Sequence, residues 1–141
     1  MDRKIIILAA LSAAAGEHHT PVQVQKLMFL IDREIPDRIG GPHFNFQPYN
    51  YGPFDKTLYD ELEELESEGY VQTVFEQTWR NYRLTRHGQE LGEKSLASLP
   101  PEAQEYIKRA SNFIRSLSFR QLVLAIYKAF PEMRENSVFQ G

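Results

Sequence analysis

The segment from Asp55 to Gly69 carries the strongest chemical signature in this chain, because its carboxylates recur at helical spacing. It holds seven acidic residues and one basic residue, a local net charge of -6. Residues three or four apart share one helix face, so Asp60 with Glu64, or Glu61 with Glu64 and Glu68, could hold a hard cation weakly. No dedicated cation-binding loop accompanies them. We therefore expect no metal or other cofactor, and interpret the face as solvated or as a docking surface for a basic partner protein.

An aromatic cluster precedes the acidic segment, in a connector rich in glycine and proline. Tyr49, Tyr51 and Phe54 lie in the run Pro-Tyr-Asn-Tyr-Gly-Pro-Phe, and Tyr59 follows in the acidic segment. Such side chains most often pack over a core. The alternative is an exposed patch that binds a partner protein or an unstacked base. The partner-binding surface that we expect comprises Tyr49, Tyr51, Phe54, Tyr59, Asp60, Glu61, Glu64 and Glu68.

A few basic side chains could contact nucleic acid. Arg80, Arg83 and Arg86 follow a short polar turn, and Lys56 lies within the acidic segment. Phosphates on both sides of a DNA groove would repel the acidic segment, so sequence-specific DNA binding through it is disfavoured. The arginines themselves could touch phosphates or simply form a solvated face. The same two interpretations apply to Lys108, Arg109, Arg115 and Arg120.

The four histidines show neither metal-site spacing nor a neighbouring nucleophile. His18 and His19 are adjacent, His43 lies near the aromatic cluster, and His87 falls in the first turn of an expected helix. The sequence contains no Gly-x-Ser-x-Gly elbow, phosphate-binding loop or dinucleotide fingerprint. We therefore expect a protein that is not an enzyme, and keep an enzyme as the third hypothesis.

Composition narrows the class of protein further. The chain has 141 residues, of which 42% are hydrophobic, so it suits one domain with a substantial core. Its net charge of -3 argues against wholesale attraction to nucleic acid or to an anionic membrane. It has no cysteine, which suits a reducing cytoplasm, and we expect a cytoplasmic protein.

The N-terminus offers a second interpretation. Arg3 and Lys4 precede the apolar run from Ile5 to Ala15, which superficially satisfies a secretory signal peptide. Ser12 interrupts that run and Asp2 lies among the basic residues. We favour a first core helix, and the run is too short to span a bilayer.

Capping residues and hydrophobic spacing predict the first elements of structure. One helix covers about residues 3–14. A second begins with Thr20 as N-cap, with Gln23 completing a capping box, and runs to about Glu34. The alternation in residues 43–47 predicts a short strand. A third, acidic helix follows and ends at Gly69.

Later elements are inferred in the same way. A hairpin pairs residues 70–75 with 79–84, and Thr85 caps a short helix that contains Leu91. Residues 92–99 are small and polar and read as a connector. Two amphipathic helices then cover about residues 103–117 and 119–130, and residues 132–141 form a strap or a frayed end.

This order of elements from Leu58 to Leu91 resembles the winged-helix pattern of many small bacterial and archaeal regulators. Residues 24–30, Val-Gln-Lys-Leu-Met-Phe-Leu, together with the Tyr-Gly-Pro turn at Tyr51 and the Leu-Tyr-Asp-Glu-Leu run from Leu58, are similar to the Panacea-domain family. That family includes SocA-like antitoxins and phage-associated proteins. The resemblance covers roughly residues 5–75 and implies a domain that binds another protein, commonly a toxin or a proteolytic adaptor.

We therefore expect one winged-helix domain over residues 1–141, of mostly helical α+β class. Its core would span about residues 3–96, and two helices over about residues 100–131 would extend it. The expected function is regulatory, antitoxin-like protein binding, without a membrane partner. The alternative is a transcription regulator that contacts DNA through the hairpin arginines. The apolar stripe from Ala103 to Phe130 could form a homodimer or complete the monomer's own core.

Overall fold

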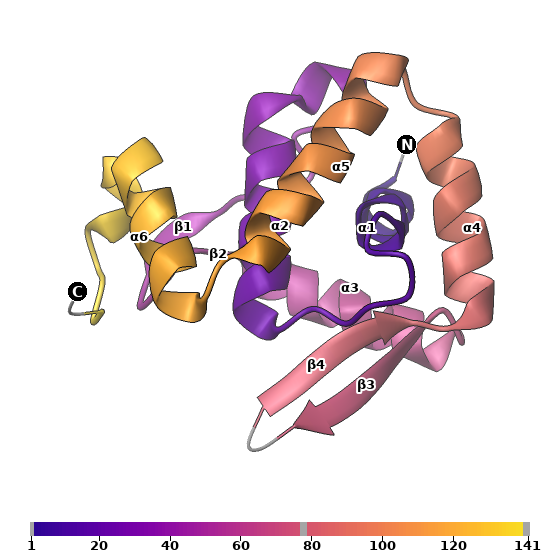
Figure 1. Ribbon diagram of the computed structural model, residues 1–141, viewed down its shortest axis with the longest axis horizontal. Coiled ribbons are helices and arrows are strands. Elements are labelled where there is room, and N and C mark those ends of the chain that lie inside the picture. The colour runs from indigo at the N-terminus through magenta and orange to yellow at the C-terminus, as the bar shows by residue number, and fades with distance from the viewer. Residues whose placement is uncertain (1, 77–78, 140–141) are drawn as a thin grey trace.

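Two apolar helices form the centre of the fold in this computed structural model, which describes residues 2–76 and 79–139. Helix α1 (Arg3–Ser12) is buried along its whole middle, so the apolar run at the N-terminus serves as a core helix. Helix α2 (Pro21–Glu34) begins with the expected capping box between Thr20 and Gln23. In Figure 1, α1 lies between α2 and α4.

The connector between α2 and α3 differs from the prediction. After a short 3-10 helix, η1 (Pro36–Arg38), the chain forms a hairpin of β1 (Gln47–Tyr49) and β2 (Gly52–Phe54). The strand predicted at residues 43–47 is therefore wrong except for Gln47. The buried carboxylate of Asp32 accepts hydrogen bonds from the backbone N–H groups of His43 (2.7 Å) and Phe44 (2.9 Å). Those donors are thus satisfied by a side chain instead of by a second strand.

The acidic helix and the following hairpin agree with the prediction. Helix α3 (Lys56–Ser67) has Asp55 as its N-cap, and Gly69 follows it with a φ of +87°. Strands β3 (Val71–Glu76) and β4 (Trp79–Leu84) pair in antiparallel register from Val71↔Leu84 to Glu76↔Trp79. The turn residues Gln77 and Thr78 lie outside the described residues. On the other side of β4, a two-residue bridge joins His19 to Tyr82.

Helix α4 (Arg86–Ala97) is longer than predicted. Thr85 caps it as expected, but the helix continues through residues 92–97, where the sequence predicts a connector. The small residues there are the contact surface against α1. A Cβ added at Gly92 would lie 2.4 Å from the carbonyl oxygen of Leu8, so only glycine permits this approach.

The C-terminal third follows the predicted helical pair. Helix α5 (Pro101–Ser116) buries Ala103, Ile107 and Ile114, and α6 (Phe119–Ala129) begins with the expected capping box at Ser118. A 3-10 turn, η2 (Pro131–Arg134), follows. The apolar stripe of these helices is thus largely used by the chain's own core.

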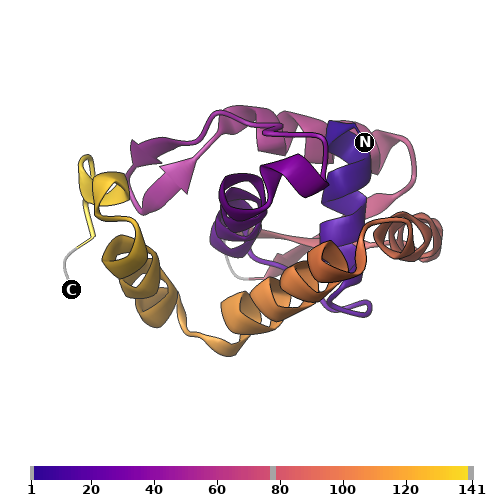
Figure 2. The same cartoon turned by 90° about the horizontal axis from the view of Figure 1, so that it is seen from above.

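The observed class is the mostly helical α+β arrangement that the sequence indicates, with two small antiparallel hairpins. One hydrophobic core joins residues from α1, α2, α3, the β3–β4 hairpin, α5 and α6. Figures 1 and 2 place α4 at one end of the molecule, and α6 with the β1–β2 hairpin at the other. Within residues 2–76 and 79–139, none of the helices combines the length and apolarity needed to cross a membrane.

Candidate functional site

The β1–β2 hairpin presents the predicted aromatic cluster at its turn. We call Tyr49, Tyr51 and Phe54 the aromatic turn. Tyr49 is 51% exposed and Tyr51 is 42% exposed, whereas Phe54 is partly buried. Gly52 has a φ of +109°, a conformation that side chains rarely adopt, and this allows the tight return of the chain. The two tyrosines therefore lie on the surface and outside the core.

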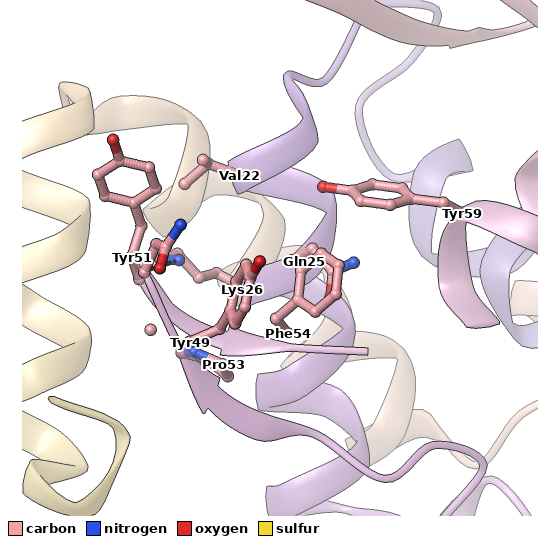
Figure 3. Close-up of a pocket in the computed structure, with 10 residues that line it drawn as sticks. Val22, Gln25, Lys26, Tyr49, Tyr51, Pro53, Phe54 and Tyr59 are labelled. Atoms are coloured by element: carbon pink, nitrogen blue, oxygen red, sulfur yellow. Dashed lines mark hydrogen bonds between the residues drawn. The ribbon is translucent and has the colours of Figure 1, made fainter. Parts of the chain in front are cut away.

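Two neighbouring side chains of α2 hold this hairpin in place (Figure 3). The Gln25 amide donates to the backbone carbonyl of Asp55 and accepts from the Asp55 N–H, both at 3.0 Å. Nζ of Lys26 donates to the backbone carbonyl of Tyr51 at 2.5 Å. The Gln-Lys pair and the Tyr-Gly-Pro turn, which are separate in sequence, thus form one structural unit.

Lys26 is only 2% exposed, so its ammonium is desolvated. This burial lowers the pKa of Lys26 to about 7. The amine lines a pocket of about 160 Å³ between α2 and the hairpin, together with Gln25 and Phe54. Either protonation state can donate the hydrogen bond to Tyr51, so the amine works here as an anchor for the turn.

The end of the chain holds the hairpin from its other side. Residues 135–139, the C-terminal strap, cross the turn between β1 and β2. The Val138 N–H donates to the carbonyl of Asn50 at 3.0 Å, and the Ser137 hydroxyl donates to the same oxygen at 3.3 Å. Of the two alternatives predicted for residues 132–141, the strap is the one observed over residues 135–139, whereas residues 132–134 lie in η2 and residues 140 and 141 lie outside the described residues.

A chain of ring contacts connects the aromatic turn to α3 and to the second hairpin. Tyr49 stacks on Phe54 with ring centroids 4.8 Å apart, and Phe54 meets Tyr59 edge-on at 5.7 Å. Tyr59 in turn stacks on Tyr82 at 6.2 Å. Burial raises the pKa of Tyr59 to about 12. The fold thus brings together three of the predicted aromatic residues, Tyr49, Phe54 and Tyr59.

Tyr51 instead faces α6, where it forms a groove that the sequence analysis missed. Its ring meets that of Phe119 edge-on at 5.2 Å, and Phe119 is 47% exposed. The groove has a volume of about 500 Å³ and an almost entirely apolar lining. We call it the α2–α6 groove; its lining residues are Thr20, Pro21, Val22, Tyr51 and Phe119.

The predicted acidic residues divide into two groups. Glu61 lies 3.9 Å from Arg3, and Lys4 pairs with both Glu64 (3.3 Å) and Glu68 (3.0 Å). These three carboxylates therefore contact the start of α1, where two cations offset part of their charge. Asp60 is exposed and lies next to Tyr59, close to the aromatic chain.

The predicted nucleic-acid-binding residues are dispersed. Lys56 pairs with Asp60 at 3.4 Å, and Arg86 pairs with Glu90 at 3.3 Å. Arg80 and Arg83 are both exposed on β4. They are three residues apart, so they point to opposite faces of the strand and cannot share one phosphate contact.

Only His18 and His19 are neighbours, and His43 and His87 lie in other parts of the fold. His19 is 1% exposed within its bridge to Tyr82, and a ring nitrogen of His43 lies 2.7 Å from the carbonyl of Ile39. His87 is exposed on α4. Across the described part of the chain, acidic and histidine side chains nowhere gather in the groups of three that a metal ion would need.

The arrangement as a whole is suited to binding another molecule, because its aromatic rings are exposed on a hairpin that is anchored from two sides. Comparisons of the chain with protein-family models, with curated proteins and with solved structures found no match.

Proposed function

We propose that this chain is a non-enzymatic winged-helix domain that binds a partner protein through its aromatic turn, in the manner of an antitoxin. The observation that carries the proposal is the combination of exposure and anchoring at Tyr51. Its ring is 42% exposed, while its backbone carbonyl is held by the buried Lys26. Aromatic side chains on a rigid backbone supply contact area at a low entropic cost, as protein-binding hot spots do.

The order of elements supports a winged helix. Helix α1, the bridge residue His19, α2, α3 and the β3–β4 hairpin follow one another as in that fold, with the β1–β2 hairpin inserted between α2 and α3. The bridge gives β4 a partner on its second edge through two 2.8 Å hydrogen bonds between His19 and Tyr82. In the proposed winged helix, the β3–β4 hairpin is the wing.

The alternative function is regulation of transcription through DNA binding, and exposure of Arg80, Arg83 and Arg86 favours it. Two features favour protein binding instead. Arg86 already has an ion-pair partner, and the exposed start of α3 offers Asp60 beside Lys56. The phosphates on both sides of a DNA groove would repel that carboxylate.

Site-directed photo-cross-linking in the organism that encodes the chain tests the proposed function. A benzoylphenylalanine residue would replace Tyr49 or Tyr51, and the matched control would carry it at Phe113, an equally exposed aromatic position on α5. We expect a specific protein to be captured at positions 49 and 51 and not at 113. Tyr51→Ala should then weaken binding of that purified protein by roughly tenfold or more, and Phe113→Ala should not.

Two further results separate antitoxin activity from general binding and from DNA binding. Expression of the captured protein alone should stop growth, and co-expression of this chain should restore it. Fluorescence anisotropy with random duplex DNA, across salt concentration, should show no tight and steeply salt-dependent binding. Tight binding of that kind, weakened by Arg83→Ala, together with no capture at position 51, would replace the proposal with the DNA-binding alternative.

A further inference from the structure

We propose that the α2–α6 groove binds an acidic, amphipathic segment of a partner protein. The inference rests on the proposed protein-binding function and specifies the chemistry of the bound segment. The charge of the bound segment is therefore the opposite of that expected from the acidic helix, which suggests a basic partner.

The groove has the size and lining of a site for apolar side chains. Its volume of about 500 Å³ is within the range of ligand pockets, and its walls are nearly free of polar groups. Tyr51 and Phe119 form one wall, and Phe139 of the C-terminal strap supports Phe119 edge-on at 5.9 Å. Val22 and Pro21 at the start of α2 complete the lining. Apolar side chains of a partner segment would anchor here.

The stretches of sequence that supply the groove's lining contain no acidic residue. Its lining residues belong to residues 18–31, 38–54 and 106–131, and none of these stretches contains an aspartate or glutamate. The third stretch carries five basic residues in a chain whose net charge is -3. These residues are Lys108, Arg109, Arg115, Arg120 and Lys128.

Two of these arginines border the groove. Arg120 directly follows the lining residue Phe119, and Arg115 is close enough to His19, next to the lining residue Thr20, for its charge to act on that ring. Among the described side chains, neither arginine has an ion-pair partner. The N-termini of α2 and α6 also meet at the groove, and their dipoles add positive potential. Carboxylates flanking an apolar anchor would be attracted by all four features.

Three carboxylates of α3 and its C-cap contact the start of α1. Arg3 and Lys4 pair with Glu61, Glu64 and Glu68 at the start of α1. Charge is thus segregated, with partly compensated carboxylates at the start of α1 and, near the groove, two arginines without ion-pair partners among the described side chains. An acidic segment fits the groove, and a basic one would be repelled from it.

Selection of a random peptide library displayed on phage against the purified full chain tests the inference. We expect the enriched peptides to combine Trp, Phe or Leu with Asp or Glu, and to bind more weakly as salt increases. Fluorescein-labelled copies would then be titrated with variants. Phe119→Ala, and Arg115→Glu combined with Arg120→Glu, should each weaken binding by roughly tenfold or more. Phe113→Ala and Arg109→Glu are the matched controls and should leave it unchanged, with circular dichroism confirming the fold of every variant.

Three outcomes would overturn the inference. The enriched peptides could be basic, they could bind equally well to Phe119→Ala, or none could be enriched while sedimentation shows a dimer that Phe119→Ala dissociates. The last result would assign the groove to a second copy of this chain. If position 51 captures a partner whose binding is insensitive to the arginine reversal, the proposed function stands and the acidic segment does not.

Discussion

Nζ of Lys26 lies 2.5 Å from the backbone carbonyl oxygen of Tyr51, so a buried amine on α2 holds the backbone of an exposed tyrosine of the candidate site. Gly52, the next residue, has a φ of +109°, so the backbone conformation of the turn requires glycine. A Cβ added there would be in ordinary contact with the same nitrogen, at 3.4 Å. This contact holds the backbone of Tyr51, while the residue remains 42% exposed.

The buried Lys26 should make stability depend on pH. Its pKa is about 7 in the folded protein and 10.5 for an unperturbed lysine, so the unfolded chain binds more protons between these values. Stability should therefore rise with pH in this window, by up to about 1.4 kcal/mol per pH unit. Urea unfolding at about pH 7 and at about pH 9 measures this slope. Both pH values lie below the pKa of ordinary tyrosines.

Lys26→Met should remove that component of the slope, because methionine has similar length and no titratable group. Lys108→Met, at an exposed position of α5, is the control and should retain it. An identical slope in Lys26→Met and in the parent protein would show that this amine remains charged up to the usual lysine range.

Gln25 should stabilise the second arm of the β1–β2 hairpin. Gln25→Ala leaves both the N–H and the carbonyl of Asp55 without their present partner. We expect a loss of about 1–3 kcal/mol in the free energy of unfolding and faster hydrogen exchange at the Asp55 amide. Gln47→Ala, at an exposed position of the same hairpin, should change neither. Unchanged exchange at Asp55 in the Gln25 variant would mean that the hairpin holds itself in place.

The sequence predicted elements whose signals are local. Thr20 with Gln23 and Ser118 with Gln121 are complete capping boxes, and the structure contains both. Prediction from the sequence failed where a residue's role depends on a distant segment. Alternation in residues 43–47 suggested a strand, because nothing local reveals that the Asp32 carboxylate binds the backbone there.

The same difference between local and long-range signals applies to the candidate site. The local density of aromatic residues was enough to predict Tyr49, Tyr51 and Phe54 as site residues. Phe119 could not be predicted in this way, because only the packing of α6 brings it to Tyr51. The pairing of Lys4 with Glu64 and Glu68 likewise joins residues far apart in the chain.

His19 should make the protein less stable in mild acid. Burial is the main cause that lowers its pKa to about 3, with the charge of Arg115 assisting, whereas an unperturbed histidine has a pKa of 6.5. The unfolded chain therefore binds the extra proton as the pH falls from about 6.5 to about 3, and stability decreases across that window by up to about 1.4 kcal/mol per pH unit. Urea unfolding of His19→Gln should show a shallower acid loss than the parent. The adjacent His18→Gln is the control, and equal acid loss in the two variants would contradict the role of His19.

Gly92 should be the least replaceable glycine of the α1–α4 contact, although it lies inside a helix. Alanine normally favours a helix over glycine by about 1 kcal/mol, so propensity alone predicts stabilisation by Gly92→Ala. The added methyl would meet the Leu8 carbonyl oxygen at 2.4 Å and the Ser12 side chain at 2.8 Å, and the first of these is backbone that cannot swing aside. We expect a net loss of about 1–3 kcal/mol by thermal or urea unfolding, because overpacking forces α4 away from α1. Lys94→Ala, exposed on the same helix, should have little effect. A stabilised Gly92→Ala variant would show that the two helices separate easily and that α4 is only loosely attached to the core.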